Sequence, residues 1–226
     1  MNWQDIGFLI SKNKYNENSA IAEFFTNEHG KVSGLIFGAT SKKIKNYLFL
    51  GNKFHINYYS KSDNSIGSVK LEIDEIKTPK FLNDKHRLLA IIYITNLIKI
   101  LTVENQSNKK IYDLLIFFFD FLENDNWLTN FIFLELEICK NVGYDIDFKN
   151  YVKKIENDQE IKFIVESNNK IIPNFLINKN FDEVDKNEIL QGFKIVGDFL
   201  NKTVIQPNNI NFPQSRNELI NSLKLS

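Results

Sequence analysis

Apolar and polar residues alternate along the first third of the chain. Residues 69–74 place Val, Leu and Ile between Lys, Glu and Asp, a period of two that is typical of a half-buried strand. Segments 21–26 and 31–37 flank a short polar stretch that ends in Gly30, and this arrangement predicts a hairpin. We expect four or five short antiparallel strands between residues 19 and 77. Strands so close together predict a small barrel or sandwich.

The apolar period becomes helical after Pro79. Apolar residues then recur three and four positions apart, first from Leu82 to Leu101 and again from Ile111 to Leu122, as on the buried face of a helix. Between residues 151 and 180 the pattern is mixed, with strand-like fragments such as 161–165. Three further helices are expected at residues 126–141, 184–202 and 214–223. The chain is therefore predicted to be α+β with two domains: an all-β domain, residues 1–79, and an all-α helical domain, residues 80–226.

Composition narrows the class of protein. Hydrophobic residues make up 43% and charged residues 25% of the 226, which is close to the average for globular proteins. The longest apolar stretch, Ile111–Leu122, falls short of the roughly 18 residues that a membrane span needs and contains Asp113 and Asp120. No secretory signal is expected, because the first ten residues have no basic segment and no small-residue cleavage site. We therefore expect a cytoplasmic protein with no membrane association.

The net charge of zero hides an uneven distribution. No Asp or Glu lies between Lys31 and Ser62, while six lysines and several aromatic residues do. Lysines neutralise phosphates, and exposed rings stack on bases at about 1–3 kcal/mol each. The alternative is that most of these rings pack into a β core while the lysines only solvate its outer face. The candidate nucleic-acid contacts are the basic residues Lys12, Lys14, Lys31, Lys42, Lys43 and Lys45, with Phe37, Tyr47 and Tyr59 as candidate stacking rings.

The sequence contains no recognisable catalytic motif. The three histidines, His29, His55 and His86, show no metal-ligand spacing. Carboxylates two positions apart, such as Glu135 and Glu137, are splayed around a helix and do not converge on one site. Cys139, the single cysteine, lies in an apolar helix and is expected to be a buried thiol. We therefore expect no catalytic residue, no metal site, no cofactor and no enzymatic activity.

Several segments resemble the RecO family. The similarity runs through Trp3–Ile10, Lys14–Ala20, Phe25–Gly34 and Gly38–Lys43, and continues more loosely around Phe199–Pro207 and Pro213–Arg216. The resemblance implies an N-terminal OB-fold that binds single-stranded DNA, followed by a helical domain. It also implies a role in DNA repair and homologous recombination: annealing of DNA strands, and loading of a recombinase onto DNA coated with single-strand-binding protein.

The resemblance also implies partners. These are single-stranded and double-stranded DNA, the RecR and RecF proteins, and the C-terminal tail of single-strand-binding protein. The protein is then expected in the cytoplasm, associated with the nucleoid.

One departure from the family concerns a zinc element that many relatives carry after the central helices. The corresponding stretch, Gly143–Pro173, contains no cysteine, and Tyr151 stands where the first ligand would be. Four-coordinate zinc needs thiolate or imidazole ligands, so we expect no metal in this degenerate region. We expect apolar packing to replace it, through Phe148, Tyr151, Ile161, Phe163 and Ile171.

A second function remains open from the sequence. The phenylalanines of residues 117–121 could present a groove to a partner peptide, which would make the chain a helical interaction scaffold with incidental DNA contact. They cover too wide an arc for one exposed stripe, so a core position is favoured. A nuclease would need clustered carboxylates or histidines to hold magnesium, and the sequence shows no convincing cluster.

Overall fold

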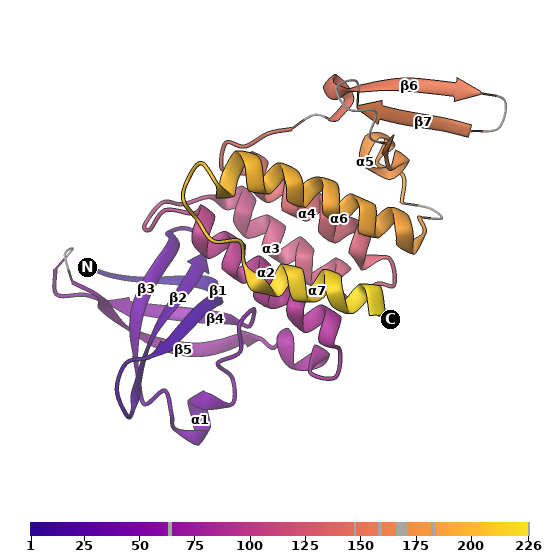
Figure 1. Ribbon diagram of the computed structural model, residues 1–226. Helices are drawn as coiled ribbons and strands as arrows, with labels where there is room; N and C mark the ends of the chain where they lie inside the picture. Colours follow the sequence, from indigo (N-terminus) through magenta and orange to yellow (C-terminus); the bar gives the residue numbers. More distant parts are fainter. Residues whose placement is uncertain (63–64, 147, 158–159, 166–170, 182–183, 226) are drawn as a thin grey trace. The chain divides into compact units, whose positions relative to one another are not determined.

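Five strands form the first part of the chain and close into a barrel. The computed structural model describes residues 1–226 apart from 63–64, 147, 158–159, 166–170, 182–183 and 226. Around the barrel the strands follow the order β1-β2-β3-β5-β4 (Figure 1). The strands are β1 (Asn2–Lys14), β2 (Ser19–Thr26), β3 (Gly30–Phe37), β4 (Lys53–Tyr59) and β5 (Gly67–Glu75), and a short helix, α1 (Lys42–Lys45), lies between β3 and β4. The expected fold of the first part of the chain, a small β-barrel, is confirmed.

The long strand β1 joins the two sides of the barrel. Its first half pairs with β4, from Asn2 opposite Tyr59, and its second half pairs with β2, up to Lys14 opposite Ala20. β3 and β5 are parallel and pair only briefly, at residues 34–35 and 67–68. These directions bring the C-terminal ends of β1, β3 and β5 to one end of the barrel, together with the N-terminal ends of β2 and β4.

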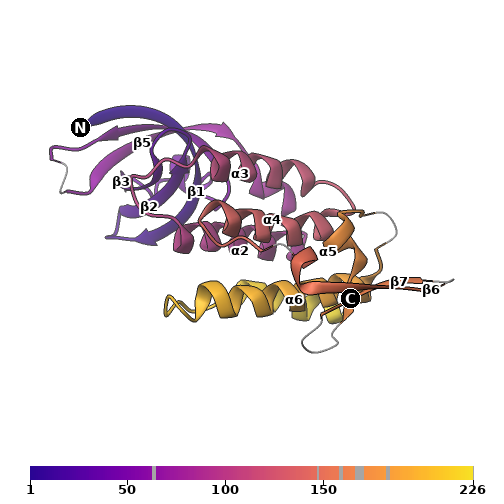
Figure 2. The same cartoon turned by 90° about the horizontal axis from the view of Figure 1, so that it is seen from above.

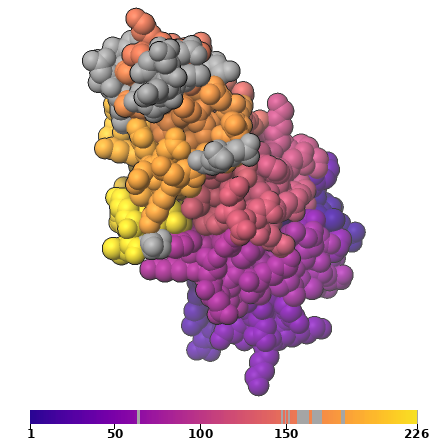
Figure 3. Space-filling view, turned by 90° about the vertical axis from the view of Figure 1, so that its right-hand side faces the viewer, coloured from indigo at the N-terminus to yellow at the C-terminus, as the bar shows by residue number. Residues whose placement is uncertain are grey.

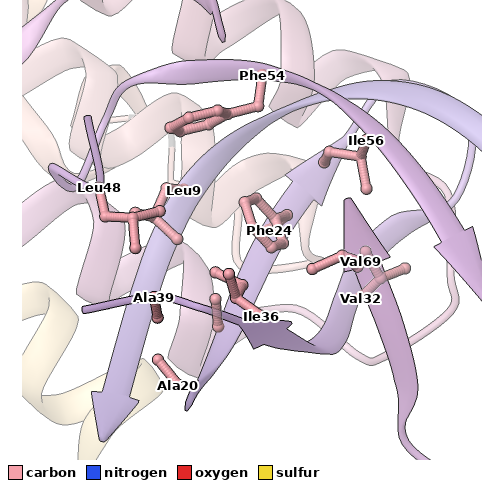
Figure 4. Close-up of a cluster of buried hydrophobic side chains, with 11 residues drawn as sticks. Leu9, Ala20, Phe24, Val32, Ile36, Ala39, Leu48, Phe54, Ile56 and Val69 are labelled. Atoms are coloured by element: carbon pink, nitrogen blue, oxygen red, sulfur yellow. The ribbon is translucent and has the colours of Figure 1, made fainter. Parts of the chain in front are cut away.

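The core of the barrel follows the alternation of the strands. Inward-facing residues such as Leu9, Phe24, Phe54 and Ile56 are at most 2% exposed and form one apolar cluster (Figure 4). Phe24 and Phe54 meet edge to face, with ring centroids 6.2 Å apart. Full burial of such a side chain stabilises a fold by about 1.5–3 kcal/mol, so this cluster is a main source of the barrel's stability.

The rest of the chain is mainly helical, as predicted. A 3₁₀ turn (Thr78–Phe81) precedes α2, and a π turn (Asn201–Ile205) extends α6. Asp84 caps α2, because its side chain accepts a hydrogen bond from the Arg87 amide. No helix among the described residues is long and apolar enough to cross a bilayer. The helices are α2 (Lys85–Leu101), α3 (Lys109–Phe121), α4 (Trp127–Asn141), α5 (Asn174–Asn178), α6 (Lys186–Leu200) and α7 (Gln214–Leu225).

The chain divides into two compact units. The first comprises Met1–Phe119 with Pro213–Leu223, and the second Asp120–Phe212 with Lys224–Ser226. In the first unit α2 packs on the barrel, where the Lys99 ammonium donates to Ser11 Oγ over 2.9 Å. The boundary at residue 79 marks the change from strands to helices. As a division between domains it stays a prediction.

Strands also occur within the mainly helical part. β6 (Val152–Asn157), β7 (Glu160–Val165) and β8 (Ile171–Ile172) form a small antiparallel sheet in the order β6-β7-β8, and Figure 2 shows β6 beside β7. The strand-like fragment at 161–165 is thereby confirmed. The C-terminal part is mainly helical rather than all-α, because residues 160–163 alternate polar and apolar side chains.

The packing expected in place of the zinc element holds for two of its five residues. Phe148 and Phe163 are buried, whereas Ile171 is 43% exposed and its neighbour Ile172 is buried instead. Ile171 was therefore wrongly assigned to this core, because adjacent strand residues face opposite sides of a sheet. The side chains of Tyr151 and Ile161 lie outside the described residues.

The phenylalanines of α3 belong mostly to the core, as favoured from the sequence. Phe118, Phe119 and Phe121 are at most 3% exposed, and Phe117 is 52% exposed. In the second unit, α6 is amphipathic, with Phe193 and Val196 buried and its polar side, including Lys194, exposed. In Figure 3 the orange surface includes the exposed side of α6.

Candidate nucleic-acid interface

One end of the barrel gathers most of the predicted site residues. It is formed by the C-terminal ends of β1 and β3, the N-terminal end of β2 and the connection of residues 38–52 that contains α1. We call this region the basic end. It carries Lys12, Lys14, Lys42, Lys43 and Lys45, together with the rings of Phe37 and Tyr47.

Helix α1 supplies three of these lysines. It has four residues, and Lys42, Lys43 and Lys45 are all exposed, while Ile44 packs against the barrel core. Its first turn contains no acidic residue. Tyr47 follows directly and is 41% exposed. Ile44 thus anchors a single helical turn whose other side chains present positive charge to solvent.

Lys12 is exposed as a residue, but its ammonium group lies in a partly buried position. Its ammonium donates to the Leu48 carbonyl and lies 6.0 Å from the centroid of the Phe49 ring. Burial, and next the charge of Lys45, lower the pKa of Lys12 below its ordinary value. A like-charged neighbour disfavours the charged form, and an anion bound between the two ammonium groups would favour it. This pair of lysines is therefore suited to a phosphate.

Hydrogen bonds tie the β1–β2 turn to the loop before α1. The Ala39 amide donates to the Asn18 carbonyl over 3.1 Å, and Thr40 Oγ1 donates to Asn18 Oδ1 over 3.0 Å. Lys14, the last residue of β1, and Lys42, the first residue of α1, therefore adjoin two loops that are tied to each other. These hydrogen bonds keep the backbone that carries the two lysines together at this end of the barrel.

Tyr15 is a further candidate that the sequence analysis did not select. It lies at the start of the β1–β2 turn, and its ring is exposed, with 61% of the residue accessible. Its amide donates to the Ser19 carbonyl over 2.9 Å, which fixes the backbone at this point. Tyr15 lies outside the lysine-rich segment of residues 31–62, where the candidate rings were expected. The signal that identifies Tyr15 is its position directly after Lys14 in a tight polar turn.

Lys31 and Tyr59 lie at the opposite end of the barrel. Lys31 is near the start of β3, and its ammonium donates to the Lys99 carbonyl over 2.8 Å. Tyr59 pairs with Asn2, and the ammonium of Lys70 lies 5.8 Å from the centroid of its ring. These two residues are therefore not brought together with the basic end. Lys31 and Tyr59 belong to the same segment of the sequence as the lysines of α1, but this does not show at which end of the barrel they lie.

That opposite end contains a structural cluster around Asp5. Its carboxylate is 2.9 Å from His29 Nδ1, and it also accepts hydrogen bonds from the amides of Ile6 and Glu28. Burial acts to raise the pKa of Asp5, but these hydrogen bonds, that of His29 first, outweigh it and hold the pKa below its ordinary value. The Trp3 ring stacks on His29, with centroids 4.0 Å apart. These contacts join β1 to the β2–β3 turn.

The histidines otherwise behave as polar residues of the fold. His55 Nε2 lies 3.0 Å from Asp74 Oδ1. Cys139 is buried, as expected. Within the part of the chain that the structure describes, no three His, Cys, Asp or Glu side chains come together as a possible metal site.

Comparison with known proteins identifies the family. The family model described as Recombination protein O N terminal matches residues 1–74, and the one described as Recombination protein O C terminal matches residues 82–207. The chain is similar to the DNA repair protein RecO of Wolbachia pipientis wMel, with 26% identity over 97% of this chain and 99% of the relative. The RecO protein of Rickettsia africae is 28% identical over 92% and 93% of the two chains.

A shorter match has higher identity. The DNA repair protein RecO of Rickettsia conorii is 32% identical over 65% of this chain and 62% of the relative. The C-terminal family model alone covers more than half of the chain. The order of a five-stranded barrel and a mainly helical part agrees with the order of the two family models. The chain belongs to the RecO family of recombination mediators, which act in DNA repair and are not enzymes.

Proposed function

We propose that this recombination mediator binds single-stranded DNA at the basic end of its barrel. The observation that carries the proposal is the gathering of five lysines at one end of the barrel, Lys12, Lys14, Lys42, Lys43 and Lys45, with exposed rings beside them. The segment from Lys31 to Ser62, which supplies three of these lysines, contains no acidic residue, and the β1–β2 turn contributes one, Glu17. Lysines beside exposed rings are the two components of a groove for single strands.

Binding of this kind releases counterions from the DNA backbone. For single strands, log affinity falls against log salt with a slope of roughly −0.7 for each neutralised phosphate. Five lysines that each engage one phosphate predict a slope of roughly −3 to −4. Because the rings stack on any base, little dependence on base sequence is expected.

The test is a salt titration of oligonucleotide binding with two triple variants. In the first, Lys42, Lys43 and Lys45 are changed to Ala, which removes the charge of α1. We expect weaker binding and a slope reduced in magnitude by about 2, since three phosphate contacts are lost. In the matched control, the exposed lysines Lys186, Lys194 and Lys202 are changed to Ala, with the same loss of charge. Equal slopes for the two variants would refute the proposed site.

We further propose that the bound strands are annealed and that a recombinase is loaded onto DNA coated with single-strand-binding protein. Family membership supports DNA and partners of the RecFOR pathway. RecR, RecF and the C-terminal tail of single-strand-binding protein are the proposed partners. The proposed location of the protein is the cytoplasm, with the nucleoid. Binding of purified RecR, and of a peptide with the tail sequence, tests them one at a time. The scaffold alternative gains no support from α3, where three of the four phenylalanines are buried.

A further inference from the structure

A hollow opens at the basic end of the barrel. It measures about 230 Å³, and core residues Ala20, Ala39 and Leu48 line it. The lysines among its lining residues are Lys12, Lys14 and Lys45. No acidic residue belongs to the lining. The hollow therefore combines an apolar surface with three positive charges.

The sizes of the core side chains explain why there is space at this end. Phe24 and Phe54 fill the interior, whereas positions 20 and 39 hold alanines (Figure 4). Helix α1 has only four residues and directs three of them to solvent. Mouths of β-barrels are recurrent ligand sites, and the volume lies below the range of about 300–1,000 Å³ typical of drug-sized ligands. It suits a single ring system.

An apolar surface with cations beside it selects a flat, weakly polar group attached to an anion. A nucleotide of single-stranded DNA has this chemistry, because its base is planar and its phosphate is charged. Thr40 and Asn13, which also line the hollow, offer hydrogen-bonding groups to a base edge. We propose that the hollow takes one unstacked base of the bound strand, with the adjoining phosphates on Lys12, Lys14 and Lys45.

The surroundings favour a DNA strand over an acidic peptide. Lys42 and Lys43 continue the positive surface beyond the hollow along α1. A DNA strand carries a phosphate at every nucleotide and can follow such a series of charges. The inference rests on the proposed DNA binding and adds to it a defined position for one base.

The first test compares a thymidine oligonucleotide with a strand of equal length whose bases are absent. We expect the protein to bind the complete strand more than about tenfold more tightly, because the base in the hollow and the bases stacked on exposed rings both favour it. Ala39→Val adds two methyl groups to the hollow and should lower this preference by about tenfold, the contribution of the buried base, while binding of the abasic strand stays the same. As a control, Lys42→Ala should weaken both strands alike. An unchanged preference in Ala39→Val would overturn the proposal.

A second test uses the unaltered protein, so it does not depend on how the variant folds. The methyl groups of Ala20 and Ala39 are followed by NMR during titration with thymidine monophosphate, deoxyribose 5-phosphate and an acidic peptide that ends in phenylalanine. Shifts caused by the nucleotide alone support the proposal. Equal shifts with the sugar phosphate, or shifts with the peptide alone, would overturn it.

DNA binding at the basic end and the base site in the hollow are refuted by different results. If neither strand binds, the proposed function is wrong. If Ala39→Val keeps the full preference for the complete strand, and binding remains steeply salt-dependent, DNA binding stands and only the base site is refuted.

Discussion

At the level of single residues, Tyr15 is a candidate contact that composition alone does not indicate. It belongs to a short polar turn, outside the lysine-rich segment of residues 31–62, and its position directly after Lys14 is the only sign in the sequence that it lies at the basic end. Phe37 and Tyr47 could be selected from the sequence because they lie among the lysines. Their exposure could not, since most aromatic residues of a β domain face its core.

Replacement of Tyr15 by Ala should weaken binding of single-stranded DNA roughly tenfold, because base stacking on an aromatic side chain is worth about 1–3 kcal/mol. Tyr15→Phe keeps the ring and should bind like the unaltered protein. Fluorescence anisotropy at several salt concentrations measures both variants. The salt slope should stay the same, because no charge is removed. If Tyr15→Ala binds with unaltered affinity, Tyr15 does not stack on DNA.

Asp5 makes the stability of the barrel depend on pH. Hydrogen bonds hold its pKa below its ordinary value in the folded protein, so the folded state favours the carboxylate. This stabilisation is fully present above the pKa of the unfolded chain and is lost as the pH falls through the lower folded value. Glu75, whose pKa is lowered first of all by its hydrogen bond with Lys77, acts in the same direction.

We therefore expect the free energy of unfolding to fall between about pH 5 and pH 3. Asp5→Asn removes the titrating group and should make this decline less steep, at the cost of lower stability at pH 7. Urea unfolding at a series of pH values measures both effects. Asp125→Asn, at an exposed position, serves as the control. A decline of equal steepness in Asp5→Asn would show that Asp5 does not contribute.

At the level of elements, alternation and helical periodicity were sufficient to predict β2 to β5 and most helices, but β1 lies before the residues for which strands were expected. These patterns could not predict where the connection between α2 and α3 packs. This connection lies against β3: the Asn105 amide donates to the Lys31 carbonyl over 2.8 Å, and Ser33 Oγ donates to Glu104 over 2.6 Å. Such contacts join residues some 70 positions apart, and no local pattern in the sequence records them.

Gly30 permits this close approach. Its φ is +67°, and a Cβ atom there would lie 1.9 Å from the Gln106 carbonyl oxygen. Gly30→Ala should therefore lower the free energy of unfolding by more than about 2 kcal/mol, since left-handed strain of roughly 1–2 kcal/mol adds to the clash. Gly143→Ala is the matched control, with φ of +99° and nothing within 4 Å of the added Cβ atom. Equal losses in urea unfolding would show that the contact with Gln106 does not matter.

At the level of the whole molecule, a net charge of zero coexists with a concentrated basic surface. The lysines of α1 could be predicted as one group because they are adjacent in the sequence. Joining Lys12 and Lys14 to them required the direction of β1, and separating Lys31 and Tyr59 required the directions of β3 and β4. Five of the six predicted lysines therefore form the basic end.

The most direct test of the account is the annealing of two complementary fluorescent oligonucleotides by the purified protein. We predict that the protein accelerates annealing at low salt, that high salt suppresses the effect, and that changing Lys42, Lys43 and Lys45 to Ala removes it. The triple variant of Lys186, Lys194 and Lys202 should remain active. Acceleration that persists after loss of the three α1 lysines, in a correctly folded variant, would contradict the assignment of the basic end as the surface that holds the strands.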